Sequence, residues 1–362
     1  MSIRIVPALI VGGGPAGAAA AIRLAEGGVF AELIERSAGP RDVVCGGFVG
    51  WDAIAALERL GVDAAALGAR PITRLRLVTM KRIVETKLPQ AAAGLSRRCL
   101  DEALLERAAA LGAKVRKGVT ARGGEGRTIR LDGGELLAAE TLFLATGKHE
   151  LRGLARDVPA GRGAGAVGLR ASFRPGAADM ARLAGFIELH PFDGGYAGLL
   201  LQEDGSANLC MSVSAARLRR AGGIDGLLEE LLREAPRLAA YFACVAAKWI
   251  SVSNVPYGWR ARATTEGLFR IGDQAAVIAS LAGDGIAIAL TSGIAAAEAH
   301  LAGTAAPDFQ QAFARTSARP LKLAEALRWA AERSGPRRLL TGLAGFSPGL
   351  ARWAASSTRI AS

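Results

Sequence analysis

A glycine-rich turn directly after an apolar run constrains this chain more than any other feature. Residues 8–11 are apolar and lead into Gly12-Gly13-Gly14-Pro15-Ala16-Gly17, which opens an alanine-rich stretch. The pattern predicts strand, turn and helix: Gly12 permits the tight turn, Gly14 lets the backbone approach a pyrophosphate, and Gly17 lets the helix pack on its strand. The N–H groups and the positive dipole end at the start of such a helix favour a bound phosphate.

A second apolar stretch tests this interpretation, because a single glycine motif is weak evidence. Residues 31–35 have the pattern of a buried strand and end in Glu35. An acidic residue at the end of the second strand, about twenty residues beyond the turn, is where a carboxylate binds a ribose. The pair predicts a dinucleotide-binding domain, with Glu35 and the adjacent Arg36 in contact with the ligand.

The size and composition of the chain predict a globular protein. The 362 residues are 51% hydrophobic, which is enough for one large or two adjoining domains. Residues 5–22 carry no charge, but three consecutive glycines, a proline and the lack of a small-residue cleavage site argue against a membrane span or a signal sequence. We therefore expect a cytoplasmic protein.

The four cysteines and three histidines indicate neither a disulfide framework nor a metal site. Cys45, Cys99, Cys210 and Cys244 lie far apart in the sequence without a CxxC pair. So few histidines also argue against structural zinc. Free thiols and no bound metal are expected.

The net charge of +12 would suit an anionic partner, but no nucleic-acid motif accompanies it. The arginines are scattered, and the five Trp and three Tyr offer few stacking platforms, so nucleic-acid binding is not expected. Residues 319–362 hold eight Lys or Arg and two Glu, beside Leu, Phe and Trp, in segments with helical spacing. A peripheral membrane contact through this basic C-terminus and a solvated basic face are both compatible with the pattern.

Two later stretches return to the nucleotide-binding pattern. A buried strand at 141–145 ends in Thr146-Gly147, and another at 267–271 ends in Gly272-Asp273. Downstream, Gly283-Asp284-Gly285-Ile286 opens a long helix of small residues. An aspartate directly after a buried strand can hold a sugar-alcohol hydroxyl, and amides at a helix start can hold an electron-rich ring edge.

Between these elements, alternating strands predict a second domain. Residues 74–80 and 82–88 have the pattern of paired strands, and shorter runs between 167 and 255 have that of an antiparallel sheet. The fold class is therefore α/β: a Rossmann-like domain with a central parallel sheet, an antiparallel-sheet substrate domain and a helical C-terminus. The expected boundaries are 1–70, 96–150 and 259–300 for the first domain, 71–95 and 151–258 for the second, and 301–362 for the C-terminal helical segment.

Taken together, these motifs resemble the FAD-binding signature of the flavoproteins that include aromatic-ring hydroxylases, of the para-hydroxybenzoate hydroxylase fold, and geranylgeranyl reductases. The ordered set spans residues 5–300 and is far more specific than any one motif. Two further matches resemble the reductase branch more narrowly. They are Pro40-Arg41-Asp42 before Cys45-Gly46-Gly47, and Ser96-Arg97-x-x-Leu100-Asp101.

The resemblance implies an FAD-dependent oxidoreductase that holds FAD in an extended form. At the adenosine end, the implied contacts are the pyrophosphate turn, with Gly12, Gly14, Pro15, Ala16 and Gly17, and Glu35 at the adenosine ribose. Beside the cofactor, they are Arg41 and Arg97, and in the second turn Thr146 and Gly147. At the flavin end, they are Gly272 and Asp273 at the ribityl chain, and Gly283, Gly285 and Ile286 near the pyrimidine side of the ring. A helix start at that edge fits the chemistry, because a reduced flavin carries negative charge near N1 and O2.

One departure from the family pattern concerns the electron donor. The family commonly has an Asp-Gly pair soon after the Ala-x-Gly turn, associated with FAD and the nicotinamide cofactor, whereas this chain continues Lys148-His149-Glu150. Direct reduction by NAD(P)H is therefore open, and a separate flavin reductase or electron carrier is the alternative. The Trp-x-Trp-x-Ile-Pro sequence of the related flavin halogenases is missing between Lys248 and Pro256, so halogenation is not favoured, although Lys81 would lie in a cavity strand.

Three functions remain compatible with the sequence. The first, our working hypothesis, is reduction of a carbon–carbon double bond in an apolar, prenyl- or polyene-like substrate, with Cys45 as proton donor or cavity wall. The second is hydroxylation of a phenolic or polyketide-like ring, which His190 and Tyr196 would orient or deprotonate. Pro191 and the glycines after it also favour a plain loop for His190. The third is a flavin-binding scaffold without catalysis.

Overall fold

The glycine turn and its flanking segments adopt the predicted strand, turn and helix. This computed structural model describes residues 3–159, 165–245, 248–346 and 357–359, and in it β1 (Ile3–Val11) leads through the turn into α1 (Pro15–Glu26). Pro15 occupies the first helical position, where its missing N–H costs nothing. The alanines of α1 are small, so the helix is buried on nearly every side.

The first sheet of the described residues is seven-stranded and mostly parallel. Besides β1 it contains β2 (Glu32–Glu35), β6 (Lys114–Lys117), β7 (Ala121–Glu125), β8 (Thr128–Leu131), β9 (Leu136–Leu144) and β15 (Leu268–Arg270). The order β6–β2–β1–β9 is parallel throughout, and β9 pairs on its other side with β8 near its start and with β15 near its end. The carboxyl ends of β1, β9 and β15 therefore lie side by side, which brings the turns that follow these strands together.

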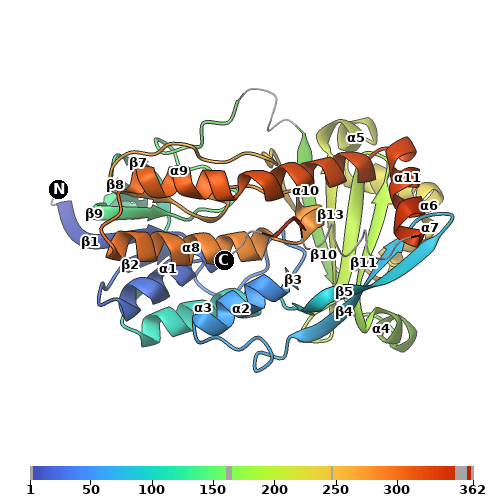
Figure 1. Cartoon of the computed structure of the whole chain (residues 1–362), viewed down its shortest axis with the longest axis horizontal. Coiled ribbons are helices and arrows are strands. Elements are labelled where there is room, and N and C mark those ends of the chain that lie inside the picture. Colours follow the sequence, from blue (N-terminus) through green and yellow to red (C-terminus); the bar gives the residue numbers. More distant parts are fainter. Residues whose placement is uncertain (1–2, 160–164, 246–247, 347–356, 360–362) are drawn as a thin grey trace.

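The second sheet is eight-stranded and occupies the right-hand end of the molecule in Figure 1. Its strands are β3 (Phe48–Val49), β4 (Arg70–Val78), β5 (Ile83–Gly94), β10 (Ala166–Phe173), β11 (Gly185–Phe192), β12 (Gly195–Leu201), β13 (Ala207–Ser214) and β14 (Ile250–Val252). Their order is β14–β10–β13–β12–β11–β4–β5–β3, and every pair is antiparallel except β11 with β4. The two sheets confirm the predicted fold class.

Helices cover both sheets. They are α2 (Trp51–Arg59), α3 (Arg97–Ala110), α4 (Ala177–Leu183), α5 (Ala215–Arg220), α6 (Ile224–Glu234), α7 (Pro236–Ala239), α8 (Gly285–Leu301), α9 (Ala306–Thr316), α10 (Ala318–Ala331) and α11 (Ser334–Phe346). Figure 1 shows α9 and α10 running end to end from the first sheet to the second. Helices α8 and α1 pack so closely that a side chain at Gly293 would collide with the backbone of Ala16.

One local expectation was wrong. The region around His190 has loop residues in its sequence, yet His190 and Pro191 belong to β11. Proline fits there because the neighbouring strand β4 pairs with β11 only as far as Leu189, so the position of Pro191 is an edge on that side.

The basic C-terminal segment lies partly outside the described residues, which omit 347–356 and 360–362. Within the described part, Arg328 pairs with two neighbouring glutamates and Arg337 pairs with Asp193, so these cations contact the protein itself. None of the described helices combines the length and the apolar composition that a membrane crossing requires. The peripheral membrane contact stays a prediction.

A buried ionic network joins β11 to β4 in the second sheet. Glu188 is fully buried and accepts hydrogen bonds from Arg76 (2.6 Å) and Tyr241 (2.9 Å), and its other neighbour is His190 Nε2 at 3.2 Å. Burial alone would raise the pKa of Glu188, but the hydrogen bonds from His190, Arg76 and Tyr241 outweigh it and lower the pKa from 4.5 to about 2. The network therefore stabilises the fold only while Glu188 is charged.

Replacing Glu188 by Gln should destabilise the protein most at neutral pH. Because the folded-state pKa is depressed, its contribution is present above pH 4.5 and is lost as the pH falls towards about 2. We expect Glu188→Gln to lower the free energy of unfolding by roughly 2–3 kcal/mol at pH 7, measured with urea, and by much less near pH 2.

The control is Glu85→Gln, which removes a carboxylate that is 31% exposed from the same Arg76. It should cost less than about 1 kcal/mol. An equal loss for Glu188→Gln at both pH values would contradict the role of its charge.

Candidate functional site

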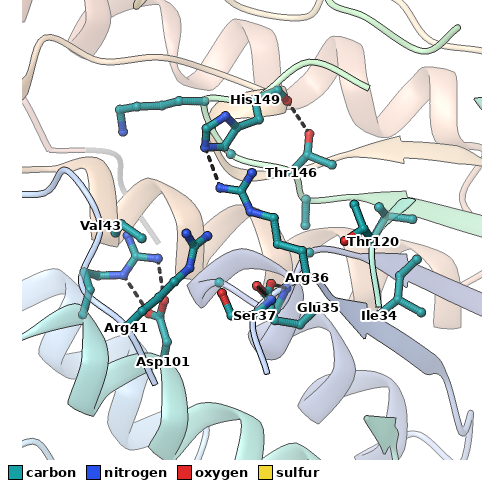
Figure 2. Close-up of a pocket in the computed structure, with 18 of the residues that line it drawn as sticks. Ile34, Glu35, Arg36, Ser37, Arg41, Val43, Asp101, Thr120, Thr146 and His149 are labelled. Atoms are coloured by element: carbon teal, nitrogen blue, oxygen red, sulfur yellow. Dashed lines mark hydrogen bonds and ion pairs between the residues drawn. The ribbon is translucent and has the colours of Figure 1, made fainter. Parts of the chain in front are cut away.

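Two adjoining cavities lie where residues of both sheets meet. The larger has a volume of about 490 Å³ and is drawn in Figure 2, and the smaller has a volume of about 160 Å³. Gly14, Arg97, Lys148 and Asp273 line both, so the two cavities form one elongated site.

The first glycine turn forms one wall of the larger cavity. Gly12 has a φ of +110°, and a Cβ atom there would lie 2.3 Å from the carbonyl oxygen of Ala145. A Cβ atom at Gly17 would collide in turn with the carbonyl oxygen of Gly12. Helix α1 begins at Gly14 with no side-chain cap, so the N–H groups of its first turn remain available to a ligand in the cavity.

Glu35 lies at the end of β2 and is held by backbone groups. Its carboxylate accepts hydrogen bonds from the N–H groups of Gly13 and Ser37, both at 2.8 Å. A carboxylate has about four acceptor positions, so it retains capacity for the hydroxyls of a ligand. Glu35 lines the larger cavity, as Figure 2 shows.

Positive charge surrounds the larger cavity. Arg36 Nη2 donates to His149 Nε2 at 2.7 Å, and burial together with Arg36 and Arg41 lowers the pKa of His149, which keeps the ring a neutral acceptor. Arg97 forms two hydrogen bonds of 2.7 Å with Asp101. Arg36 and Arg41 line this cavity without forming an ion pair with a carboxylate among the described residues, although Glu35 lies close enough to act on the charge of Arg36.

Lys148 joins the second turn to the third. Its Nζ lies 2.9 Å from Asp273 Oδ2, in the turn after β15. Burial opposes the charge on Lys148, but Asp273 outweighs it and raises the pKa of the lysine. Lys148 is therefore a cation at the point where the two cavities join.

The smaller cavity is mostly apolar. Its apolar walls are Val44, Phe48, Met211, Val252, Val255, Val277 and Ile278. Its polar groups include Cys45, Cys210 and the hydroxyls of Tyr257 and Ser280, which are 2.5 Å apart. Gly283, Gly285 and Ile286 form one side, where α8 begins without a side-chain cap.

These features fit FAD. Each cavity has one uncapped helix start, which suits the pyrophosphate in one and the electron-rich edge of a reduced flavin in the other. Positions 12 and 17 must be occupied by glycine, because a side chain at either one would prevent the first turn from forming. An acid for a ribose, and Arg36 and Arg41 for phosphates, complete the match.

The cofactor residues expected from the sequence nearly all line the two cavities. Those that do are Gly12, Gly14, Pro15, Ala16, Glu35, Arg36, Arg41, Arg97, Thr146, Gly147, Gly272, Asp273, Gly283, Gly285 and Ile286. Gly17 lies behind the turn and permits it to close. Within the part of the chain that the structure describes, no group of three acidic, histidine or cysteine residues is arranged to hold a metal ion.

The structure places the expected catalytic residues in different parts of the molecule. Cys45 lines the smaller cavity, whereas His190 lines neither cavity and belongs to the Glu188 network. Tyr196 reaches the smaller cavity only through Ser280, to which its hydroxyl donates at 2.6 Å. Lys81 is exposed at the turn between β4 and β5, so it does not lie in a cavity strand.

Sequence reasoning missed Tyr257, Ser280 and Cys210. They come from two different loops and from β13, and no local motif links them. The only signal was position, since Ser280 lies three residues before the glycine turn at 283–286.

Comparisons with known proteins agree with this geometry. Residues 5–131 match the family model of the FAD binding domain. A search of curated protein sequences found no match.

Solved structures with the same fold include enzymes of different chemistry. The flavin-dependent brominase Bmp2 is 16% identical, with a TM-score of 0.80 over 98% of this chain and 93% of that one. A geranylgeranyl bacteriochlorophyll reductase-like protein from Thermoplasma acidophilum is 18% identical, with a TM-score of 0.71 over 98% of this chain and 100% of that one. PqsL, a probable FAD-dependent monooxygenase from Pseudomonas aeruginosa, is 16% identical, with a TM-score of 0.71 over 93% of this chain and 99% of that one.

The family match confirms FAD as the cofactor that the motifs indicated, and the solved structures share the predicted fold. At such low identity the solved structures establish the fold and not the reaction or the substrate. The chain carries an FAD-binding domain over residues 5–131 and has the fold of the FAD-dependent oxidoreductases.

Proposed function

We propose that this chain is an FAD-dependent reductase of a carbon–carbon double bond in an apolar, prenyl- or polyene-like substrate. FAD would extend across both cavities, with its pyrophosphate at Gly12 and Gly14, its adenosine ribose at Glu35 and its ring beside residues 283–286. The observation that supports the choice of reaction is the smaller cavity, which is mostly apolar and has the Cys45 thiol in its wall. An apolar chain would bind next to the flavin ring, against the apolar walls of this cavity, by burial of its surface.

Reduction of a double bond needs two electrons and two protons. Reduced FAD, when bound, supplies both electrons and one hydrogen to one carbon. The protein then has to supply a proton to the neighbouring carbon, and Cys45 Sγ is the donor that we assign.

The surroundings of Cys45 suit that role. Its sulfur accepts from the N–H of Gly47 at 3.5 Å, and the side chain of Asn208 holds the loop through the carbonyl oxygens of Cys45 (3.0 Å) and Gly46 (2.7 Å). Burial opposes the charge on Arg97, but Asp101 and Cys45 raise its pKa, so this cation also interacts with the sulfur. The Gly47 N–H and the Arg97 charge lie beside the sulfur from which the proton would leave.

Hydroxylation of a phenolic ring is the second candidate, and one observation favours it. The hydroxyls of Tyr257, Ser280 and Tyr196 form a connected chain at the smaller cavity. Burial raises the pKa of Tyr257, so its hydroxyl stays protonated and can hold a phenol oxygen. His190 gives no support to this candidate, because it is bonded away from the cavity. Halogenation gains none from Lys81, which lies outside both cavities.

Anaerobic reoxidation tests the reaction most directly. Photoreduced holoprotein mixed with a prenyl or polyene substrate should recover the oxidised flavin spectrum with one equivalent of saturated product. Oxygen is absent, so a hydroxylase could not reoxidise its flavin under these conditions. A flavin that stays reduced with such substrates, together with substrate-dependent oxygen uptake and a hydroxylated phenol in air, would replace the reductase by the hydroxylase.

Replacing Cys45 by Ala should separate proton donation from cofactor binding. We expect Cys45→Ala to bind and reduce FAD as the wild type does, but to form product about 10²-fold more slowly at saturating substrate. The control is Cys244→Ala, because Cys244 is exposed and lines neither cavity. An undiminished rate in Cys45→Ala would leave Cys45 as part of the cavity wall only.

A further inference from the structure

Residues near the carboxyl end of the chain pack against the start of α8. Arg359 is hydrogen-bonded and ion-paired to Asp284, and its Nη1 lies 3.1 Å from Asp52 Oδ1 at the start of α2. Its guanidinium also lies over the ring of Trp51, 4.0 Å from the ring centre. One arginine thus bridges two helix starts that are far apart in the sequence.

Asp284 is the only residue with a polar side chain in the turn at 283–286. Its neighbours Gly283 and Gly285 line the smaller cavity, while Asp284 itself is completely buried behind them. Gly283 has a φ of +75°, and neither glycine has a side chain that could hold the turn in place. Asp284 is therefore the residue whose polar side chain connects this turn to the rest of the protein.

The charges around Asp284 need to be balanced. Asp284 and Asp52 face the same arginine, and Asp284 Oδ2 is a buried oxygen without a hydrogen-bond partner among the described residues. Burial, with a smaller contribution from Asp52, raises the pKa of Asp284 to about 8, although Arg359 and Thr358 act to lower it. Without Arg359, no cation among these groups would offset the charge of Asp52, or of Asp284 once it ionises.

The backbone at Gly50 leaves room for Arg359. A Cβ atom at Gly50 would overlap Arg359 Nη1, although Gly50 has an ordinary φ of −68° that alanine adopts freely. An alanine at position 50 would therefore require the ends of the Arg359 and Asp52 side chains to move.

We propose that Arg359 is a positioning residue for the flavin: it holds Asp284, and through it the turn at 283–286, in the arrangement that binds the ring. This inference rests on FAD occupying the two cavities as proposed above. It assigns to the C-terminal end of the chain a part in the cofactor site, although Arg359 lines neither cavity.

The test compares FAD affinity in full-length variants. Arg359→Gln should bind FAD at least about tenfold more weakly than the wild type, measured by quenching of flavin fluorescence. Gly50→Ala should show the same loss, because it displaces the arginine without changing a charge. The matched control is Gly176→Ala, since Gly176 also caps a helix start, with φ −66°, and a Cβ atom there would meet nothing within 4 Å. Wild-type affinity in Arg359→Gln or in Gly50→Ala would overturn the proposal.

A pH profile separates this role from simple loss of structure. The groups that face Asp284 are Arg359, Thr358 and Asp52. In the wild type, FAD affinity should fall as the pH rises through about 8, because Asp284 then becomes an anion beside the cavity. Arg359→Gln should move the midpoint to higher pH, since Arg359 lowers the pKa, and Asp284→Asn should abolish it. An unchanged midpoint in Arg359→Gln would overturn the proposal.

The two proposals fail in different ways. A wild type that binds FAD but does not reduce a double bond contradicts the proposed reaction and leaves the affinity comparison intact. A wild type that reduces its substrate while Arg359→Gln keeps full affinity contradicts only the role of Arg359.

Discussion

The first glycine turn depends on backbone segments that approach more closely than any side chain would allow. Gly12 lies against the carbonyl of Ala145, and Gly17 lies against the carbonyl of Gly12, so the end of β9, the turn and α1 pack without side chains between them. This contact sets where α1 begins, and with it where the N–H groups of its first turn point. The parallel pairing of β1, β9 and β15 then places the other two turns at the same edge of the sheet.

The cofactor half of the site could be predicted from the sequence because each of its parts is local. A buried strand, a glycine turn and a helix start follow one another within about a dozen residues. The spacing alone therefore located Gly12, Glu35, Gly147 and Asp273, and the structure brings them to the same two cavities.

The other polar residues of the smaller cavity could not be predicted in the same way, because they are distant in the sequence. Tyr257, Ser280 and Cys210 meet only when the second sheet packs against the first domain. His190 was expected near a substrate as a polar group in an otherwise apolar sheet region, yet it lies on the same face of β11 as the buried Glu188, at the end of the parallel pairing of β11 with β4. That pairing joins strands more than a hundred residues apart and leaves no pattern in either one.

The account depends on three separate turns binding a single FAD along the two cavities. A crystal structure of the FAD-loaded protein tests this most directly. It should show one FAD per chain, with the pyrophosphate against Gly12 and Gly14 and the ring in the smaller cavity beside residues 283–286. A ring that lies outside the smaller cavity, or a pyrophosphate away from the first glycine turn, would contradict the account.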